Sequence, residues 1–442
     1  MYTSRSAVTK IQAIALIAII AVATVAGVVY IFWNGEPQTE ETIKIGVVGD
    51  LDMTFGSAAF QGALLAAEQI NAEGGILGRN VEIIGADSDA EAGGADISVA
   101  SAALTKLITY DKVDYIITSD GAYNLPPYQD IVAEQKKILF AVRSTSETLT
   151  QRVMDDYNTY KYFFRVFYPN MTSAIDGMLD CILTVRDLTG FNKVAYLMED
   201  LTFIEPMSAG FDYYLPEVYG FELVYQGKCP PMTMDFSSYF AAIEASGAEI
   251  VVPVIFTQAA IPFVKEWHDR EAPFVLWGNL GIAQDSFFWG ATEGKCDHVA
   301  TVGVPTIAGY PLTGKTVPTR DAYVDRWGEV PNAIASAAYD SVRFILFDAI
   351  TRAGTTETDA VIEALEETDV ETSMAEHFVF TSSHDVMIGK AGPNRPDEDY
   401  MLVLLIQWQN GTQVPVYPKE LMEDAGAIYT YPHWSGPWDN IS

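Results

Sequence analysis

Short apolar runs alternate with longer apolar stripes of helical spacing along most of this chain. Residues 45–48 form an apolar run suited to a strand that is buried on both faces. A polar loop follows, and Ser57 stands where it could cap a helix. The next apolar positions recur at helical spacing: Phe60, Ala63, Leu64, Ala67 and Ile70. Glycines then end the predicted helix before a second strand at residues 81–84, and such a crossover implies a parallel sheet covered by helices.

The alternation continues and predicts an α/β protein made of two successive blocks. Further strand-like runs occur at residues 115–118, 138–142, 193–198, 250–254, 274–277 and 299–302. One block extends to about residue 167, and the other runs from about residue 168 to residue 305. The helix-rich stretch 306–376 has too few strands to stand alone.

The beginning of the chain predicts a membrane anchor. Residues 11–33 carry no charge and are long enough to span a bilayer. Arg5 and Lys10 precede them and acidic residues follow, so the positive-inside rule places residues 1–10 in the cytoplasm and exports the rest. We therefore expect a single-pass membrane protein with a linker at residues 34–42 and an extracellular globular part.

A cleaved signal peptide is the alternative, because Ala21 and Ala23 provide a small-x-small site. The anchor is favoured, since the apolar run continues beyond the length of a normal signal core. Sequons at Asn170, Asn410 and Asn440 are consistent with export.

Charge and cysteine content restrict the partners and sites. The chain has 26 basic and 59 acidic residues, a formal net charge of −33, which repels nucleic acid and anionic membrane surfaces. The cysteines and histidines show no metal-ligand spacing, so no metal site is expected. A bridge between Cys229 and Cys296 is possible in an oxidising compartment and would leave Cys181 buried on a helix.

Catalytic motifs are missing from the sequence. It contains no dinucleotide fingerprint, phosphate-binding loop, GxSxG elbow or HExxH helix. Asp50 and Asp52 form a close carboxylate pair that could act on a glycoside, but two acids in such a loop are more often structural. We therefore expect a protein that binds without catalysis and without a cofactor.

Four segments resemble type I periplasmic binding proteins, in that family's order. They are the unit at residues 45–89, YKYFFRVFYPN at 160–170, MDFSSYFAAIEASGAEIVV at 234–252 and TSSHDVMIGK at 381–390. The resemblance is strongest to the solute-binding subunits of branched-chain amino-acid ABC transporters and covers roughly residues 43–420. It implies that the chain binds a small-molecule ligand and works with ABC permease and ATPase subunits. The chain start is also similar to archaeal surface binding proteins, some of which are processed near a Lys such as Lys10.

The resemblance implies two doubly wound parallel-sheet lobes joined by a three-crossing hinge. The implied lobes are residues 43–167 with 306–376, and residues 168–305 with 377–442. The crossings then fall near Phe167, Pro305 and His377.

Loops after the strands form the expected ligand site, because ligands bind outside the carboxyl ends of parallel strands. Each of these loops precedes a helix, whose first N–H groups favour an anion. In lobe 1 the candidate contacts are Asp52 and Phe55, together with four residues where the family holds the carboxylate of an amino acid: Ala122, Tyr123, Ser144 and Thr145. In lobe 2 the family's contact positions fall on Phe203, on Phe256 and on a turn at Trp277, Gly278 and Asn279.

Two departures from the family pattern concern the charge of the ligand. Amino-acid binders place an acid near Asn279 and Leu280 to pair with the ligand's ammonium group, and neither position is acidic here. Arg143 replaces a small residue and offers bidentate pairing to a carboxylate, unless it faces solvent. A buried ammonium without a counter-charge is costly, so the sequence favours a carboxylate or another acidic or aromatic solute. The alternative function is that of a ligand-sensing receptor ectodomain acting through a separate signalling partner.

Overall fold

The computed structural model describes residues 42–89, 96–121, 123–201, 204–389, 400–402, 404–424 and 426–441. Residues 43–441 within these ranges build two α/β lobes, each with its own sheet and its own hydrophobic core. The predicted α/β architecture with parallel-sheet lobes is thereby confirmed. The expected membrane segment 11–33 lies outside the described residues. Among the residues that are described, no helix combines the length and apolarity needed to cross a bilayer.

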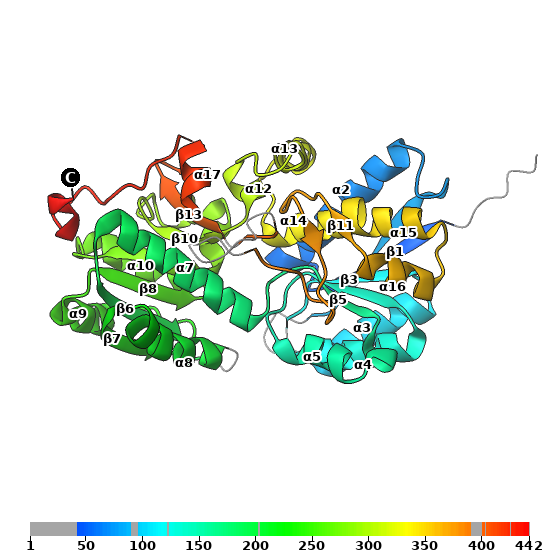
Figure 1. Cartoon of the computed structure of the whole chain (residues 1–442), viewed down its shortest axis with the longest axis horizontal. Helices are drawn as coiled ribbons and strands as arrows, with labels where there is room; N and C mark the ends of the chain where they lie inside the picture. Colours follow the sequence, from blue (N-terminus) through cyan, green and yellow to red (C-terminus); the bar gives the residue numbers. More distant parts are fainter. Residues whose placement is uncertain are drawn as a thin grey trace, which may run out of the picture. The chain divides into compact units, whose positions relative to one another are not determined.

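Lobe 1 contains a five-stranded parallel sheet in the order β2-β1-β3-β4-β5. Its strands are β1 (Ile43–Gly49), β2 (Val81–Asp87), β3 (Tyr115–Thr118), β4 (Ile138–Ala141) and β5 (Phe163–Arg165). Every residue of β3 and β4 is buried, as expected for strands covered on both faces. The intervening helices are α2 (Thr54–Ala72), α3 (Ile97–Thr109), α4 (Leu125–Gln135), α5 (Glu147–Asp155) and α6 (Tyr157–Tyr160). Figure 1 shows α3, α4 and α5 below this sheet and α2 above it.

Helix α2 begins at Thr54, earlier than the cap predicted at Ser57. Ser57 lies inside the first turn, where its hydroxyl donates to the Met53 carbonyl at 2.8 Å. Gly56 makes this start possible, because a Cβ there would lie 2.0 Å from the Asp50 carbonyl oxygen. The loop after β1 therefore folds closely over the beginning of α2.

Lobe 2 contains a seven-stranded sheet in the order β14-β13-β10-β9-β8-β6-β7. Strands β6 to β10 are parallel, whereas β13 and β14 run antiparallel at one edge. The strands are β6 (Lys193–Glu199), β7 (Glu222–Cys229), β8 (Ile250–Ile255), β9 (Val275–Leu280), β10 (Ala300–Gly303), β13 (Leu404–Gln409) and β14 (Thr412–Tyr417). The helices are α7 (Met171–Thr189), α8 (Glu205–Tyr213), η2 (Tyr214–Val218), α9 (Ser237–Ser246), α10 (Ala260–Asp269), η3 (Gly281–Gln284), α11 (Phe287–Ala291), α17 (Lys419–Asp424) and η5 (Pro437–Asn440).

The turn expected at Trp277, Gly278 and Asn279 is instead part of strand β9. Pro253 of the neighbouring strand β8 has no N–H to donate, and the pairing between β8 and β9 is interrupted from Val251 to Val254. Gly278 accommodates this proline, because a Cβ at Gly278 would lie 2.1 Å from the Pro253 carbonyl oxygen. The apparent turn signal of Gly278 is therefore a close approach between strands.

The stretch between β10 and β13 returns to lobe 1. Its elements are α12 (Pro305–Ala308), α13 (Thr316–Trp327), α14 (Ala333–Asp340), η4 (Ser341–Leu346), α15 (Phe347–Ala353), α16 (Thr358–Glu366), β11 (Asp369–Val370) and β12 (Phe378–Val379). Helices α14 and α15 lie above the lobe 1 sheet beside α2, in yellow in Figure 1.

The core residues show where the chain crosses between the lobes. Buried residues up to Phe167 belong to the core of lobe 1, and those from Met171 to Val302 belong to the core of lobe 2. From Val304 onward the buried residues belong to the core of lobe 1 again. The third crossing lies later than His377, because β12 pairs with β11 and Phe378 packs in the core of lobe 1. The strand at Phe378 therefore completes lobe 1, and the described chain re-enters lobe 2 only near Leu402 and β13.

Cys181, Cys229 and Cys296 are free and buried, so the bridge considered for Cys229 and Cys296 is not formed. Burial raises the pKa of Cys229 and that of Cys296 to about 12. These thiols are therefore protonated at neutral pH and act as small apolar side chains.

Candidate functional site

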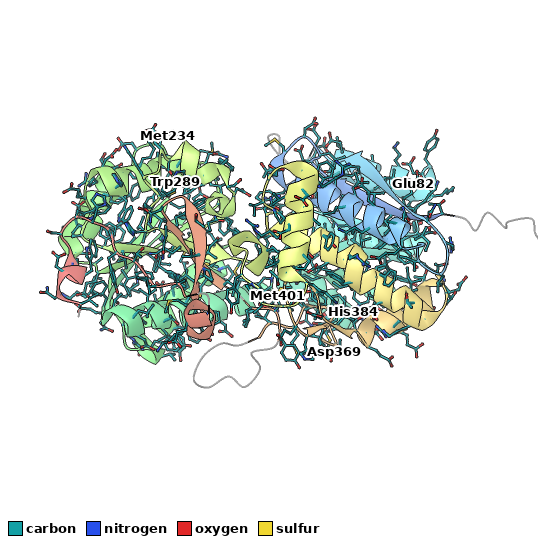
Figure 2. All side chains as sticks on the ribbon, turned by 90° about the horizontal axis from the view of Figure 1, so that it is seen from above. Glu82, Met234, Trp289, Asp369, His384 and Met401 are labelled. Atoms are coloured by element: carbon teal, nitrogen blue, oxygen red, sulfur yellow. The ribbon has the colours of Figure 1, made fainter. Side chains whose placement is uncertain are left out.

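A cavity of about 370 Å³ lies between the lobes, at the carboxyl ends of strands from both sheets. All three crossings contribute to its wall, and Met401 of the third crossing lies at the junction of the lobes in Figure 2. The apolar lining residues are Phe167, Tyr168, Pro169, Met171, Ala174, Met178, Met207, Phe256, Val302, Ile388, Met401 and Leu402. The other lining residues are Gly121, Tyr123, Arg143, Ser144, Thr145, Thr257, Asn279, Gln284 and Gly303.

The structure brings six of the sequence-predicted site residues together around this cavity. Tyr123, Arg143, Ser144 and Thr145 come from the loops after β3 and β4, and Phe256 and Asn279 come from lobe 2. Tyr123 is 65% exposed and lies at the rim, whereas Ser144 is buried.

The remaining predicted residues are placed elsewhere. Asp52 is exposed and is not part of the lining. Phe55 does not line the cavity either, but its ring lies 3.9 Å from the guanidinium carbon of Arg143. Trp277 lies in the core of lobe 2 with no exposed surface, two residues before Asn279 in β9. Ala122 and Phe203 lie outside the described residues.

Arg143 determines the electrostatics of the lobe 1 wall. Burial raises the pKa of Asp120 and that of Tyr168, and the charge of Arg143 opposes this shift in both residues. The carboxylate of Asp120, in the loop after β3, accepts from the hydroxyls of Ser88 at 2.7 Å and Tyr128 at 2.6 Å. Because Asp120 is hydrogen-bonded within lobe 1, it fixes the loop after β3 next to Arg143.

The loop that carries Ser144 and Thr145 is held from behind by Arg165, at the end of β5. The guanidinium of Arg165 donates to the carbonyls of Ser144 and Ser146, both at 2.7 Å. On its other side, the Thr145 carbonyl accepts the Met171 N–H at 2.9 Å, across the first crossing. These bonds orient the loop at the boundary between the lobes.

The helix N-termini differ from the expectation that each one supplies several N–H groups. Helix α4 has Pro126 and Pro127 in its first turn, and proline has no N–H. Helix α5 keeps its donors but begins with Glu147, whose carboxylate accepts the Thr172 N–H of α7 at 2.9 Å. The anion-binding capacity of lobe 1 therefore depends more on Arg143 and on the loop at Ser144 and Thr145 than on α4.

Glu199 is a positioning residue that sequence reasoning did not find. It is fully buried at the end of β6 and accepts the N–H groups of Phe256 at 2.8 Å and Thr257 at 3.2 Å, as well as the Thr257 hydroxyl. It therefore fixes the loop after β8 that forms part of the lobe 2 wall. Its acidic residue type directly after an apolar strand run is the only sequence signal for this role.

The methionine wall of the cavity was also not predicted. Met171, Ala174 and Met178 lie at positions i, i+3 and i+7 of α7 and therefore share one face of that helix. Met207 of α8 and Met401 add to this wall. In sequence such residues look like ordinary core positions, and only packing reveals that they surround a cavity.

In the described part of the chain, no cluster of three or more His, Cys, Asp or Glu side chains has a geometry that could hold a metal ion. The polar groups in the described lining, among them Arg143, Ser144 and Thr145, can bind an organic molecule by charge and hydrogen bonds.

Comparison with known proteins identifies the family. Residues 42–391 match the family model described as periplasmic binding protein. This chain belongs to the periplasmic binding protein family. The resemblance seen in the sequence is thereby confirmed.

Relatives of this periplasmic binding protein are distant in sequence but similar in fold. Leu/Ile/Val-binding protein homolog 7 of Brucella abortus (strain 2308) is 22% identical over 383 residues, 85% of this chain and 89% of the relative. A putative branched-chain amino acid ABC transporter from Silicibacter pomeroyi has a TM-score of 0.75 at 19% identity, covering 89% of this chain and 100% of that one. An ABC transporter solute binding protein from R. palustris in complex with benzoate has a TM-score of 0.66 at 17% identity, covering 85% of this chain and 96% of that one. These relatives are bacterial and give no support to the archaeal likeness of the N-terminus.

Proposed function

We propose that this periplasmic binding protein captures a small organic solute and delivers it to the permease and ATPase subunits of an ABC-type importer. The observation that carries the proposal is the position of the cavity, between two lobes and beside all three crossing segments. Hinge rotation at such crossings lets two lobes close on a ligand and release it. The name of the Brucella relative and the benzoate complex of the R. palustris neighbour support solute capture.

The polar head of the solute would bind to lobe 1, at Arg143, Ser144 and Thr145, with Tyr123 at the rim. The lobe 2 wall, including Phe256 and Asn279, would pack against the rest of the molecule. The lining combines a few polar groups with many apolar ones, which is typical of small-molecule sites. Binding would involve no chemical change of the solute.

The globular part would lie outside the cell, tethered by residues 11–33 as a single-pass anchor. The uncharged run and the basic residues before it support this arrangement. Tethering would keep the binding protein close to its permease without a lipid modification.

A thermal-shift screen over amino acids, carboxylates and aromatic acids tests the proposal. A solute at about 100 times its Kd stabilises the folded state by about 2.7 kcal/mol and raises Tm. The bound solute should be recovered unchanged by mass spectrometry, and vesicles carrying the importer should take it up only when this protein is added. Failure of all solutes to bind would contradict the proposal. Turnover would indicate an enzyme, and binding without uptake would favour a sensor.

A further inference from the structure

We propose that the solute is an organic acid with one carboxylate, no ammonium group and a bulky apolar body. This inference rests on the proposed function and names the chemical class of solute for the same cavity. Three observations carry it: the charge of the lining, the existing bonds of the nearby acids, and the methionine wall.

The charged side chain among the described lining residues is Arg143, and no Asp or Glu belongs to the described lining. The Phe55 ring, 3.9 Å from the guanidinium carbon, supports Arg143 from one side by a cation–π contact. A carboxylate placed here gains the bidentate partner that a guanidinium offers. An α-amino acid would instead bring its ammonium toward the positive charge of Arg143, into a cavity whose described lining contains no carboxylate.

Two acids near the cavity, Glu199 and Asp120, are already hydrogen-bonded to the protein. Glu199 accepts two backbone N–H groups and a hydroxyl from the loop after β8. Asp120 accepts the hydroxyls of Ser88 and Tyr128. Burial raises the pKa of Asp285, next to Gln284 of the lining, to about 6 and so disfavours its charged form. Pairing an ammonium with Glu199 or Asp120 would compete with existing bonds, and Asp285 holds its charge less readily than an exposed acid. These three acids are therefore poorly suited to pairing with a zwitterion.

The rest of the wall is suited to an apolar body of variable shape. Met171, Met178, Met207 and Met401 come from two helices and the third crossing, and Ala174 leaves room between Met171 and Met178. Methionine side chains are flexible and polarisable, so such a wall adapts to a ring or to a branched chain. Met401 lies between the lobes in Figure 2, where a bound body would contact both.

Matched pairs of acids and amino acids test the charge preference on the full chain in mild detergent, by isothermal titration calorimetry. One pair is 4-methylpentanoate and leucine, and the other is 3-phenylpropanoate and phenylalanine; the members of each pair differ only in the amine. Each acid should bind about ten- to hundred-fold more tightly than its amino acid, because only the amino acid has to bury an ammonium group without a counter-charge.

Arg143→Gln should abolish most of this preference, because both members of a pair lose the same carboxylate partner but only the amino acid is freed from repulsion of its ammonium group. Arg186→Gln is the matched control, because Arg186 also stacks on a phenylalanine, 4.4 Å from the Phe221 ring, but does not line the cavity. The control variant should keep the wild-type ratio between the affinity for each acid and the affinity for its amino acid. If Arg143→Gln does not fold, the ratios measured on the wild-type protein still decide the question.

Ala174→Leu tests the apolar body. The added side chain should weaken 3-phenylpropanoate about tenfold more than propanoate, because it occupies the space between the methionines. The control Ala241→Leu, at an exposed position of α9, should change neither the affinity for 3-phenylpropanoate nor that for propanoate. Tighter binding of leucine than of 4-methylpentanoate, with Arg143→Gln leaving that ratio unchanged, would overturn the inference but leave the proposed function standing. If no solute of either class binds, the proposed function itself fails.

Discussion

Asp385→Asn should destabilise this protein strongly, because it removes the charge partner of a buried arginine. The side chains of Arg165 and Asp385 are 0% and 3% exposed, and the Nε and Oδ1 atoms lie 2.8 Å apart. Burial lowers the pKa of Arg165 and raises that of Asp385, and the charge of each partner opposes the shift in the other. The neutral amide leaves a guanidinium without its counter-charge and out of contact with water.

The expected loss is about 3–5 kcal/mol, the cost of breaking a buried ion pair by removing one partner. The free energy of unfolding of a typical protein is only about 5–15 kcal/mol, so this loss is a large share of it. Solute affinity should fall as well, because Arg165 holds the carbonyls of Ser144 and Ser146 and so orients the loop at the cavity.

Urea unfolding of Asp385→Asn, Arg165→Met and the double variant measures this coupling. The double variant should be more stable than the sum of the single losses predicts, by about 1–3 kcal/mol, because the two residues act as a pair. Glu293→Gln is the control: Glu293 pairs with Lys265 at 2.7 Å, but with side chains 67% and 30% exposed, so its loss should be at most about 1 kcal/mol. The reasoning fails if Asp385→Asn is no more destabilised than Glu293→Gln.

Three further predictions concern the site, the anchor and a buried acid. Thr145→Ala should weaken solute binding about ten- to hundred-fold by calorimetry with little change in Tm; unchanged affinity would place the polar head elsewhere. A chain lacking residues 1–41 should be soluble and bind solute as well as the full chain, because both cores lie within residues 43–441; an inactive truncation would argue against an anchor separate from the binding unit. Burial raises the pKa of Asp340 to about 7 from 3.8, although the Ser373 N–H donates to its carboxylate. The folded state then keeps a proton that the unfolded chain releases, so the stability from this group is full below about pH 3.8 and is lost as the pH rises to about 7. Asp340→Asn should flatten this pH dependence and raise the stability at pH 7 by at most about 4 kcal/mol. Thermal unfolding at a series of pH values between about 4 and 7 measures the effect. An unchanged slope of stability against pH would show that Asp340 does not cause the dependence.

Local patterns predicted much of the fold. The runs at 115–118 and 138–142 correspond to strands β3 and β4, and the runs at 193–198 and 250–254 correspond to β6 and β8. These strands are buried on both faces, so their apolar character is continuous and visible in sequence. Strand β7 was missed because all its residues except Cys229 are exposed or half-buried and several are polar, so it contains no continuous apolar run.

The site was predictable in part for the same reason. Loops after parallel strands converge at one edge of a sheet, so Arg143, Ser144 and Thr145 could be placed near the ligand from their position after a strand. Whether a lobe 2 residue faces the cavity or the core could not be predicted. Trp277 and Asn279 belong to the same strand, and only the packing of lobe 2 puts one in the core and the other in the wall.

The sequence by itself determined the order of most strands and helices, the loops after β3 and β4 and the unusual charge at Arg143, because these depend on residues close together in the chain. The tertiary structure alone decided that Arg165 pairs with Asp385, that Phe378 belongs to lobe 1, and that methionines from α7, α8 and the third crossing form one wall. His384, next to Asp385, lies within lobe 1 in Figure 2, and its carbonyl oxygen accepts the backbone N–H of Arg165 at 2.8 Å. Such contacts join residues that are far apart in the chain, so their geometry depends on how whole elements pack, and no local pattern records it.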